Sequence, residues 1–118
     1  MSIVANVVVA IVAALHVYFL VLEMFLWDKP VGLKAFGQSL EKARESKVLA
    51  ANQGLYNGFL AAGLVWGLFL GAEGTGIKVF FLSCVLIAGL YGAATASRKI
   101  LFVQAIPAAI GLALVLLT

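Results

Sequence analysis

The sequence predicts an all-α integral membrane protein built as a four-helix bundle. Of its 118 residues, 64% are hydrophobic and 11% are charged, whereas soluble domains are about half apolar and a quarter charged. The apolar residues also lie in four long runs, each close to the roughly 20 residues that cross the hydrocarbon core of a bilayer. The runs are continuous, and they exceed the roughly ten-residue alternating strands of a membrane β-barrel.

The four runs divide the chain into spans and short connections. The first run lacks the basic start of a signal peptide and is longer than that signal's apolar core, so we expect it to be retained. Little chain is left for a soluble domain, so residues 1–118 are predicted to form a single transmembrane domain. The expected spans are about 3–27, 48–70, 77–96 and 100–117.

Basic residues gather in two of the three connections. Five of the eight Lys and Arg residues lie in the first connection, 28–47, and Arg98 and Lys99 lie in the third. Loops rich in Lys and Arg face the cytoplasm, so both connections are predicted to be cytoplasmic and both termini to lie outside. This topology also accounts for the net charge of +3, and nucleic acid is not expected as a partner.

The first connection, 28–47, combines charge with helical apolar spacing. Leu33, Phe36, Leu40 and Ala43 fall at helical intervals among charged and amide side chains. Part of the segment is therefore expected to be an amphipathic helix on the membrane surface. The alternative is a solvated loop that its lysines hold near anionic lipid. Either form can cap a site that opens to the cytoplasm.

Small residues recur every four positions on two spans. They are Ala50, Gly54, Gly58 and Ala62 on the second span, and Ala88, Gly92 and Ala96 on the third. Small residues let helix backbones approach closely in lipid, so these stripes predict packing faces. Four spans enclose little volume by themselves, and polar side chains on several of them need neighbours. A homo-oligomer surrounded by membrane lipids is therefore expected.

The first span contains two ionisable residues, His16 and Glu23, seven positions apart on nearly the same helix face. Ionisable groups within a span are costly and commonly mark functional sites. The structural alternatives are a Glu23 paired with a basic residue near the inner interface and a His16 that only packs. The chain has one histidine and one cysteine, Cys84, so no metal site is predicted.

Polar side chains of the other spans complete the candidate site. Four of them occupy one broad side of the second span, and two follow one face of the third with Cys84 and Thr95. Their predicted depth matches that of Glu23, so we expect a concave ligand site in the inner half of the bundle. The candidate ligand-binding residues are Glu23, His16, Asn52, Gln53, Tyr56, Asn57, Tyr91 and Arg98.

Two quoted runs resemble a known family. "LHVYFLVLEMFLW" (15–27) and "VLAANQGLYNGFLAAGLVWG" (48–67) are similar to an uncharacterised family of small, mostly bacterial membrane proteins, domain of unknown function 1304. The resemblance covers essentially the whole chain. It implies a multi-pass protein of the bacterial cytoplasmic (inner) membrane, and it brings no established activity.

More distantly, residues 45–69 and 90–116 resemble the second and the third-to-fourth helices of the MAPEG superfamily. Its members act in eicosanoid and glutathione metabolism and are trimers of four-span subunits. The resemblance therefore implies a MAPEG-like trimer here. Gly54 and Asn57 stand where the family has an asparagine and an acid that help to hold glutathione. No cofactor is therefore expected, with glutathione as the alternative. Tyr91 and Arg98 match the family's spacing, which implies that Arg98 stabilises a thiolate.

Three functions follow from these features. The favoured one is binding of a lipid-like or amphipathic ligand, because the glutathione ligands are incomplete and the superfamily has non-enzymatic lipid-binding members. The second is a membrane transferase joining a thiol to a lipophilic substrate, with Arg98 as activator and Glu23 or His16 as base. The third is a small proton-coupled transporter that uses Glu23 and His16. It has least support, because the sequence shows no inverted repeat or matched broken helices.

Overall fold

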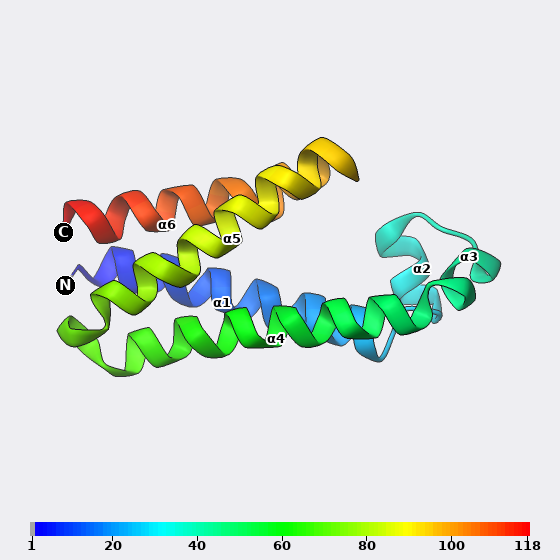
Figure 1. Cartoon of the computed structure of the whole chain (residues 1–118), viewed down its shortest axis with the longest axis horizontal. Helices are drawn as coiled ribbons and strands as arrows, with labels where there is room; N and C mark the ends of the chain where they lie inside the picture. The colour runs from blue at the N-terminus through cyan, green and yellow to red at the C-terminus, as the bar shows by residue number, and fades with distance from the viewer. Residues whose placement is uncertain (1) are drawn as a thin grey trace. The chain divides into compact units, whose positions relative to one another are not determined.

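Helices form almost all of the chain that the structure, a computed structural model, describes, which is residues 2–118. No strand occurs in these residues, so the all-α prediction is confirmed. Each of the four apolar runs holds helix to within three residues of its expected ends. In chain order (Figure 1) the elements are α1 (Ile3–Met24), α2 (Pro30–Phe36), α3 (Leu40–Glu45), α4 (Lys47–Phe69), η1 (Gly71–Gly74), α5 (Thr75–Thr95), η2 (Leu101–Ala105) and α6 (Ile106–Leu117).

Two helical stretches are long and apolar enough to cross a membrane, judged by length and composition. They are Ile3–Met24, and Gly71–Thr95, which joins the 3₁₀ turn η1 to α5. Leu101–Leu117 is apolar but shorter. α4 has the necessary length, but Asn52, Gln53 and Asn57 make it less apolar than α1 and α5.

The ends of α1 are set by short-range chemistry. The Ser2 hydroxyl accepts a hydrogen bond from the Ala5 backbone N–H at 3.2 Å and so caps one of the free donors of the first turn. The helix stops at Met24, three residues before the expected end of the first span. Lys29 is extended because Pro30 follows it, and proline then occupies the first position of α2.

The first connection folds into two short helices, where the sequence suggested one amphipathic segment. Gly37 ends α2 in the left-handed conformation, with φ of 58°, and its N–H returns to the carbonyls of Leu33 and Lys34. Ser39 then caps α3 by accepting a hydrogen bond from the Lys42 N–H at 3.2 Å. The helical spacing of apolar residues is therefore interrupted between Phe36 and Leu40.

The fourth run begins with a wide turn. Pro107 has no backbone N–H, so it cannot donate the α-helical hydrogen bond. In a regular α-helix its ring would also clash with the carbonyl of the residue four positions earlier. The chain forms the π-helical turn η2 just before it, in which the Ile106 N–H bonds to the Leu101 carbonyl, five residues back. α6 then continues as a regular helix to Leu117.

The chain forms two compact units, which we describe separately. The first unit comprises residues 1–15 and 60–118, and the second comprises residues 16–59. In the first unit α5 and α6 lie side by side (Figure 1), and Gly89 allows the Ala105 backbone to approach α5 closely. The core of this unit is formed by Ala5, Val9, Val12, Ala13, Leu64, Leu82, Val85, Ala108 and Val115.

The small-residue stripes coincide only partly with the packing faces. Gly54 is buried as expected, but Ala62 and Ala88 are exposed, and Gly89 makes the close contact on α5. An α-helix turns 100° per residue, so positions four apart drift by about 40° at each step. Small residues spaced strictly by four therefore turn away from the neighbouring helix after about two turns.

Candidate functional site

Glu23 and Asn57 form a polar pair between the end of α1 and the first half of α4. The Asn57 Nδ2 donates a hydrogen bond to Glu23 Oε1 at 2.5 Å. Asn57 is buried, and Glu23 is half-buried. The structure records no second partner for the Glu23 carboxyl among the described residues, so one of its oxygens is left to accept a further hydrogen bond.

Glycine residues on α4 allow the two helices to meet at this pair. A Cβ on Gly54 would lie 2.7 Å from Met24 Cγ, 3.1 Å from Glu23 Cβ and 3.2 Å from the Leu20 carbonyl oxygen. At Gly58 a Cβ would meet only the flexible end of Leu20, at 2.7 Å. The close approach explains why the short Asn57 side chain reaches Glu23.

The other candidate residues of α4 face away from α1. Asn52, Gln53 and Tyr56 are exposed, whereas Asn57 is buried beside the glycines. The Asn52 Nδ2 donates to the Val48 carbonyl of its own helix at 3.0 Å. Of the four polar residues that the sequence placed on one broad side of this helix, the structure therefore brings only Asn57 to Glu23.

His16 lies two helical turns before Glu23 and is fully buried. Its ring packs edge-on against Phe19, with ring centroids 5.2 Å apart. This edge-on arrangement is a favourable aromatic contact, and the roles weighed for His16 from the sequence stay predictions.

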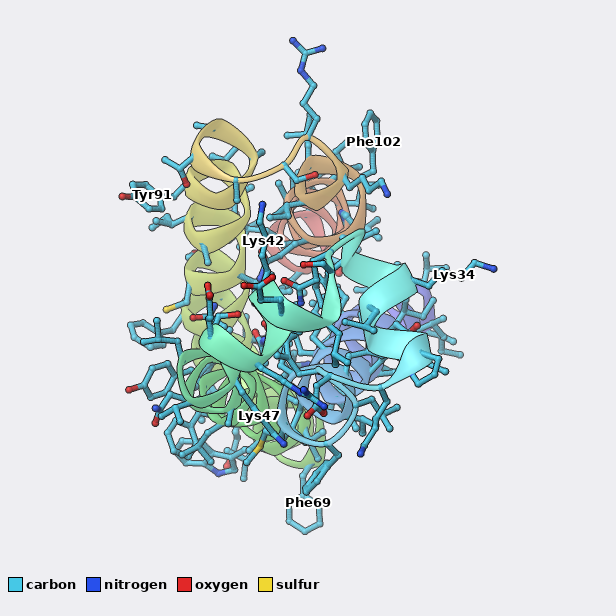
Figure 2. The ribbon with its side chains drawn as sticks, turned by 90° about the vertical axis from the view of Figure 1, so that its right-hand side faces the viewer. Lys34, Lys42, Lys47, Phe69, Tyr91 and Phe102 are labelled. Atoms are coloured by element: carbon cyan, nitrogen blue, oxygen red, sulfur yellow. The ribbon has the colours of Figure 1, made fainter. Side chains whose placement is uncertain are left out.

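Tyr91 and Arg98 belong to the first unit, and both are exposed. Tyr91 is 72% exposed, and its side chain points away from α5 (Figure 2). α5 ends at Thr95, where the Thr95 hydroxyl bonds back to the Tyr91 carbonyl at 2.7 Å. Arg98 therefore lies in the turn after α5 and not on a continued helical face, because the helix stops three residues before it.

A second polar pair, the buried Lys78 and the partly buried Asn6, was not among the candidates from the sequence. Lys78 is fully buried near the start of α5, and its Nζ donates to Asn6 Oδ1 of α1 at 3.2 Å. Gly67 of α4 makes room for its aliphatic chain, since a Cβ there would lie 2.7 Å from Lys78 Cγ. The signal in the sequence was a lysine near the start of the expected span 77–96, inside the apolar run IKVFFLSCVLIAGL.

The chemistry within reach of these groups is hydrogen bonding to a small polar group. Glu23 offers a carboxylate acceptor, and Asn57 and the exposed α4 side chains offer amide and phenol groups. Across residues 2–118, no group of three or more His, Cys, Asp and Glu side chains gathers where it could hold a metal ion. The lone Cys84 lies partly buried on α5.

The chain is similar in sequence to an uncharacterized bacterial protein. It is 29% identical over 106 residues to the uncharacterized protein YpaA of Lactococcus lactis subsp. lactis (strain IL1403), a match covering 88% of this chain and 89% of YpaA. No solved structure matches the chain. Residues 10–116 match the family described as "Protein of unknown function (DUF1304)". Because that match spans nearly the whole chain, the protein belongs to the DUF1304 family.

Proposed function

We propose that this protein is an integral membrane protein that binds a lipid-like or amphipathic molecule in a cleft between copies of the chain. The observation that carries the proposal is the outward exposure of Asn52, Gln53 and Tyr56 on α4, with Leu49 and Phe59 exposed beside them. Amide and phenol groups that face hydrocarbon need hydrogen-bond partners. A ligand with a polar end and an apolar tail supplies both kinds of contact.

Residence in the membrane is supported by the exposure of the apolar helices. Only 28% of the most apolar window of Ile3–Met24 and 22% of that of Gly71–Thr95 is buried. The core helix of a soluble protein is mostly buried, whereas lipid solvates such surfaces directly. The proposed protein has four spans, α1, α4, α5 and η2–α6, with both termini outside and the connection 28–47 in the cytoplasm.

Assembly is proposed from the same exposed side of α4. Polar side chains in a span commonly hydrogen-bond across to another helix. A second copy that covers Asn52 and Tyr56 only partly leaves a cleft lined by their polar atoms on one side and by exposed apolar residues on the other. The assembly that the MAPEG resemblance implies, a homotrimer, provides three such clefts.

Glu23 does not line this cleft, because it contacts the opposite side of α4 through Asn57. Asn57 occupies one carboxyl oxygen, and the other oxygen can accept a further hydrogen bond from a separate polar group. The binding-protein function therefore uses Asn52, Gln53 and Tyr56 as its polar contacts. It requires no reaction at Arg98, which lies outside the helix in the turn after α5.

Native mass spectrometry of the full chain in mild detergent tests this proposal. We expect a trimer that retains a lipid-sized molecule, and we expect the N52L/Q53L/Y56F variant to lose that molecule while its helix content is unchanged. Tyr18→Phe is the matched control, because Tyr18 is an exposed tyrosine on α1 and its variant should retain the molecule. A strict monomer with nothing bound would overturn the proposal. Retained glutathione in place of lipid would also overturn it and would favour the transferase.

A further inference from the structure

The outward surface of α2 is basic and contains no acidic residue. Lys29 and Lys34 are exposed, and Val31, one turn from Lys34, is 56% exposed. From Lys29 to Ser39 the chain has no Asp or Glu. Figure 2 looks onto this end of the second unit and shows the Lys34 side chain directed away from α2.

The opposite surface of α2 is fixed to the end of α1. Gly32 lies so close to the Leu26 carbonyl that a Cβ there would come within 1.9 Å of its oxygen. The Phe36 ring packs on Trp27 with centroids 4.7 Å apart. The Trp27 Nε1 donates to the Ser46 hydroxyl at 3.1 Å, which also ties this end of α1 to the end of α3. α2 therefore presents its basic surface in a fixed direction.

We infer that this surface binds the headgroups of anionic phospholipids, with Lys29 and Lys34 on the phosphates and Val31 at the acyl boundary. Lysines can extend their ammonium groups to the headgroups while their methylenes cover apolar surface. Trp27 packs on the opposite surface of α2 through Phe36 and belongs to the residue type that is enriched at membrane interfaces. The inference rests on the membrane residence of the proposed function and assigns a surface that the proposed cleft does not use.

A comparison with the neighbouring helix α3 explains why we assign headgroup binding to α2. Lys42 and Arg44 are exposed there, but Glu41 and Glu45 lie among them within the six residues of α3. The charges of α3 therefore balance, whereas those of Lys29 and α2 do not, because the neighbouring Asp28 is paired with Lys47. An anionic leaflet attracts a surface through its unbalanced positive charge, so charge complementarity favours α2.

Lipid-specific quenching of Trp27 tests the inference. The chain has two tryptophans, so Trp66→Phe leaves Trp27 as the tryptophan that reports from beside α2. The full-length protein in phosphatidylcholine vesicles containing 30% phosphatidylglycerol is compared with either lipid brominated. We expect brominated phosphatidylglycerol to quench Trp27 more strongly, and we expect the preference to fall roughly fivefold for each lysine changed in K29Q/K34Q. Salt at 0.5 M should weaken it, because exposed charges are screened.

Four controls make the result specific. K42Q/R44Q removes the same charge from α3 and should keep the preference, as should the charge-conserving K29R/K34R. The Trp27→Phe protein, which reports from Trp66, should be quenched equally by the two lipids. The N52L/Q53L/Y56F variant should keep the headgroup preference, so failure of the cleft and failure of this surface are distinguished. Equal quenching of Trp27 by both lipids, or an equal loss in K29Q/K34Q and K42Q/R44Q, would overturn the inference.

Discussion

The side-chain amide of Asn57 on α4 donates a hydrogen bond to the carboxyl of Glu23 on α1, joining two helices at residues 34 positions apart in the sequence. In this contact the side chains of α1 and α4 share a hydrogen bond, at the place where Gly54 allows the two backbones to approach closely. The pair therefore sets the register of α1 against α4.

Loss of the Asn57 amide should destabilise the protein more than loss of an exposed amide. Asn57→Leu leaves a half-buried carboxyl without its donor, so we expect the free energy of unfolding to fall by about 1–3 kcal/mol. Glu23→Gln keeps an acceptor for Asn57 and should cost less. Thermal denaturation in detergent measures both, with Asn52→Leu as the exposed control. Equal losses in Asn57→Leu and Asn52→Leu would contradict the structural role of the pair.

The two glycines of α4 that face α1 should respond differently to alanine. Gly54→Ala places a methyl 3.2 Å from the Leu20 carbonyl oxygen, which belongs to the backbone and yields little, so we expect a loss of about 1–2 kcal/mol. Gly58→Ala meets only the mobile end of Leu20 and gains helix propensity, so it should stabilise by about 0.5–1 kcal/mol. The same melting assay decides, and a larger loss at Gly58 would refute this packing.

The Lys78–Asn6 pair of the first unit predicts an asymmetric response. Asn6→Val leaves a buried amine without the acceptor it now has at 3.2 Å, and we expect a loss of about 3 kcal/mol. Lys78→Met replaces the group by an apolar chain of similar length and should be nearly neutral. The N6V/K78M variant should then be as stable as Lys78→Met. A double variant that is no better than Asn6→Val would show that the two side chains act independently.

Removal of the side-chain amide of Gln38, between α2 and α3, should stabilise the protein. Its Nε2 is buried and is the one buried side-chain nitrogen or oxygen in the described residues that lacks a hydrogen-bond partner. Because an unsatisfied buried donor costs about 1–3 kcal/mol, Gln38→Met should raise the melting temperature. Gln53→Met, at an exposed amide of α4, is the comparison and should change it little. A lower melting temperature for Gln38→Met would mean that the amide has a partner in solution.

Acid should weaken the ion pair that closes the first connection. Lys47 Nζ donates a hydrogen bond to Asp28 Oδ2 at 3.0 Å, and this bond lowers the pKa of Asp28 below its ordinary value of 3.8. The pair therefore stabilises the fold above that value, and its contribution is lost as the pH falls through the lowered pKa. Wild type should melt slightly above Asp28→Asn at pH 7, and the difference should shrink as the pH is lowered below 3.8. A difference that persists in acid would exclude the ion pair as its cause.

Much of the fold could be predicted from hydrophobic patterning alone. The four apolar runs ended close to α1, α4, α5 and η2–α6, because an uninterrupted apolar run has few alternatives to a helix. The division of the first connection was harder to predict. It depends on Gly37 and Ser39, whose capping roles act within one turn and compete with the longer apolar spacing.

The candidate site was predicted in composition but not in arrangement. Glu23 and Asn57 were both expected, yet the sequence could not show that Asn57 alone turns toward α1, since four polar residues cover a side of α4 wider than one partner helix. Lys78 was missed because its pairing with Asn6 depends on a distant segment of the chain. The ligand roles of His16, Tyr91 and Arg98 stay predictions.

The wide turn η2 has a consequence for how the last helix accommodates its proline. Ile100 packs at Gly92 and Ala105 packs at Gly89, so two residues five positions apart face the same neighbouring helix. A regular α turn brings residues four apart to one side. The wide turn therefore keeps both Ile100 and Ala105 against α5 although Pro107 follows directly after it. The last helix can thus carry a proline and still pack on α5 before and after the turn.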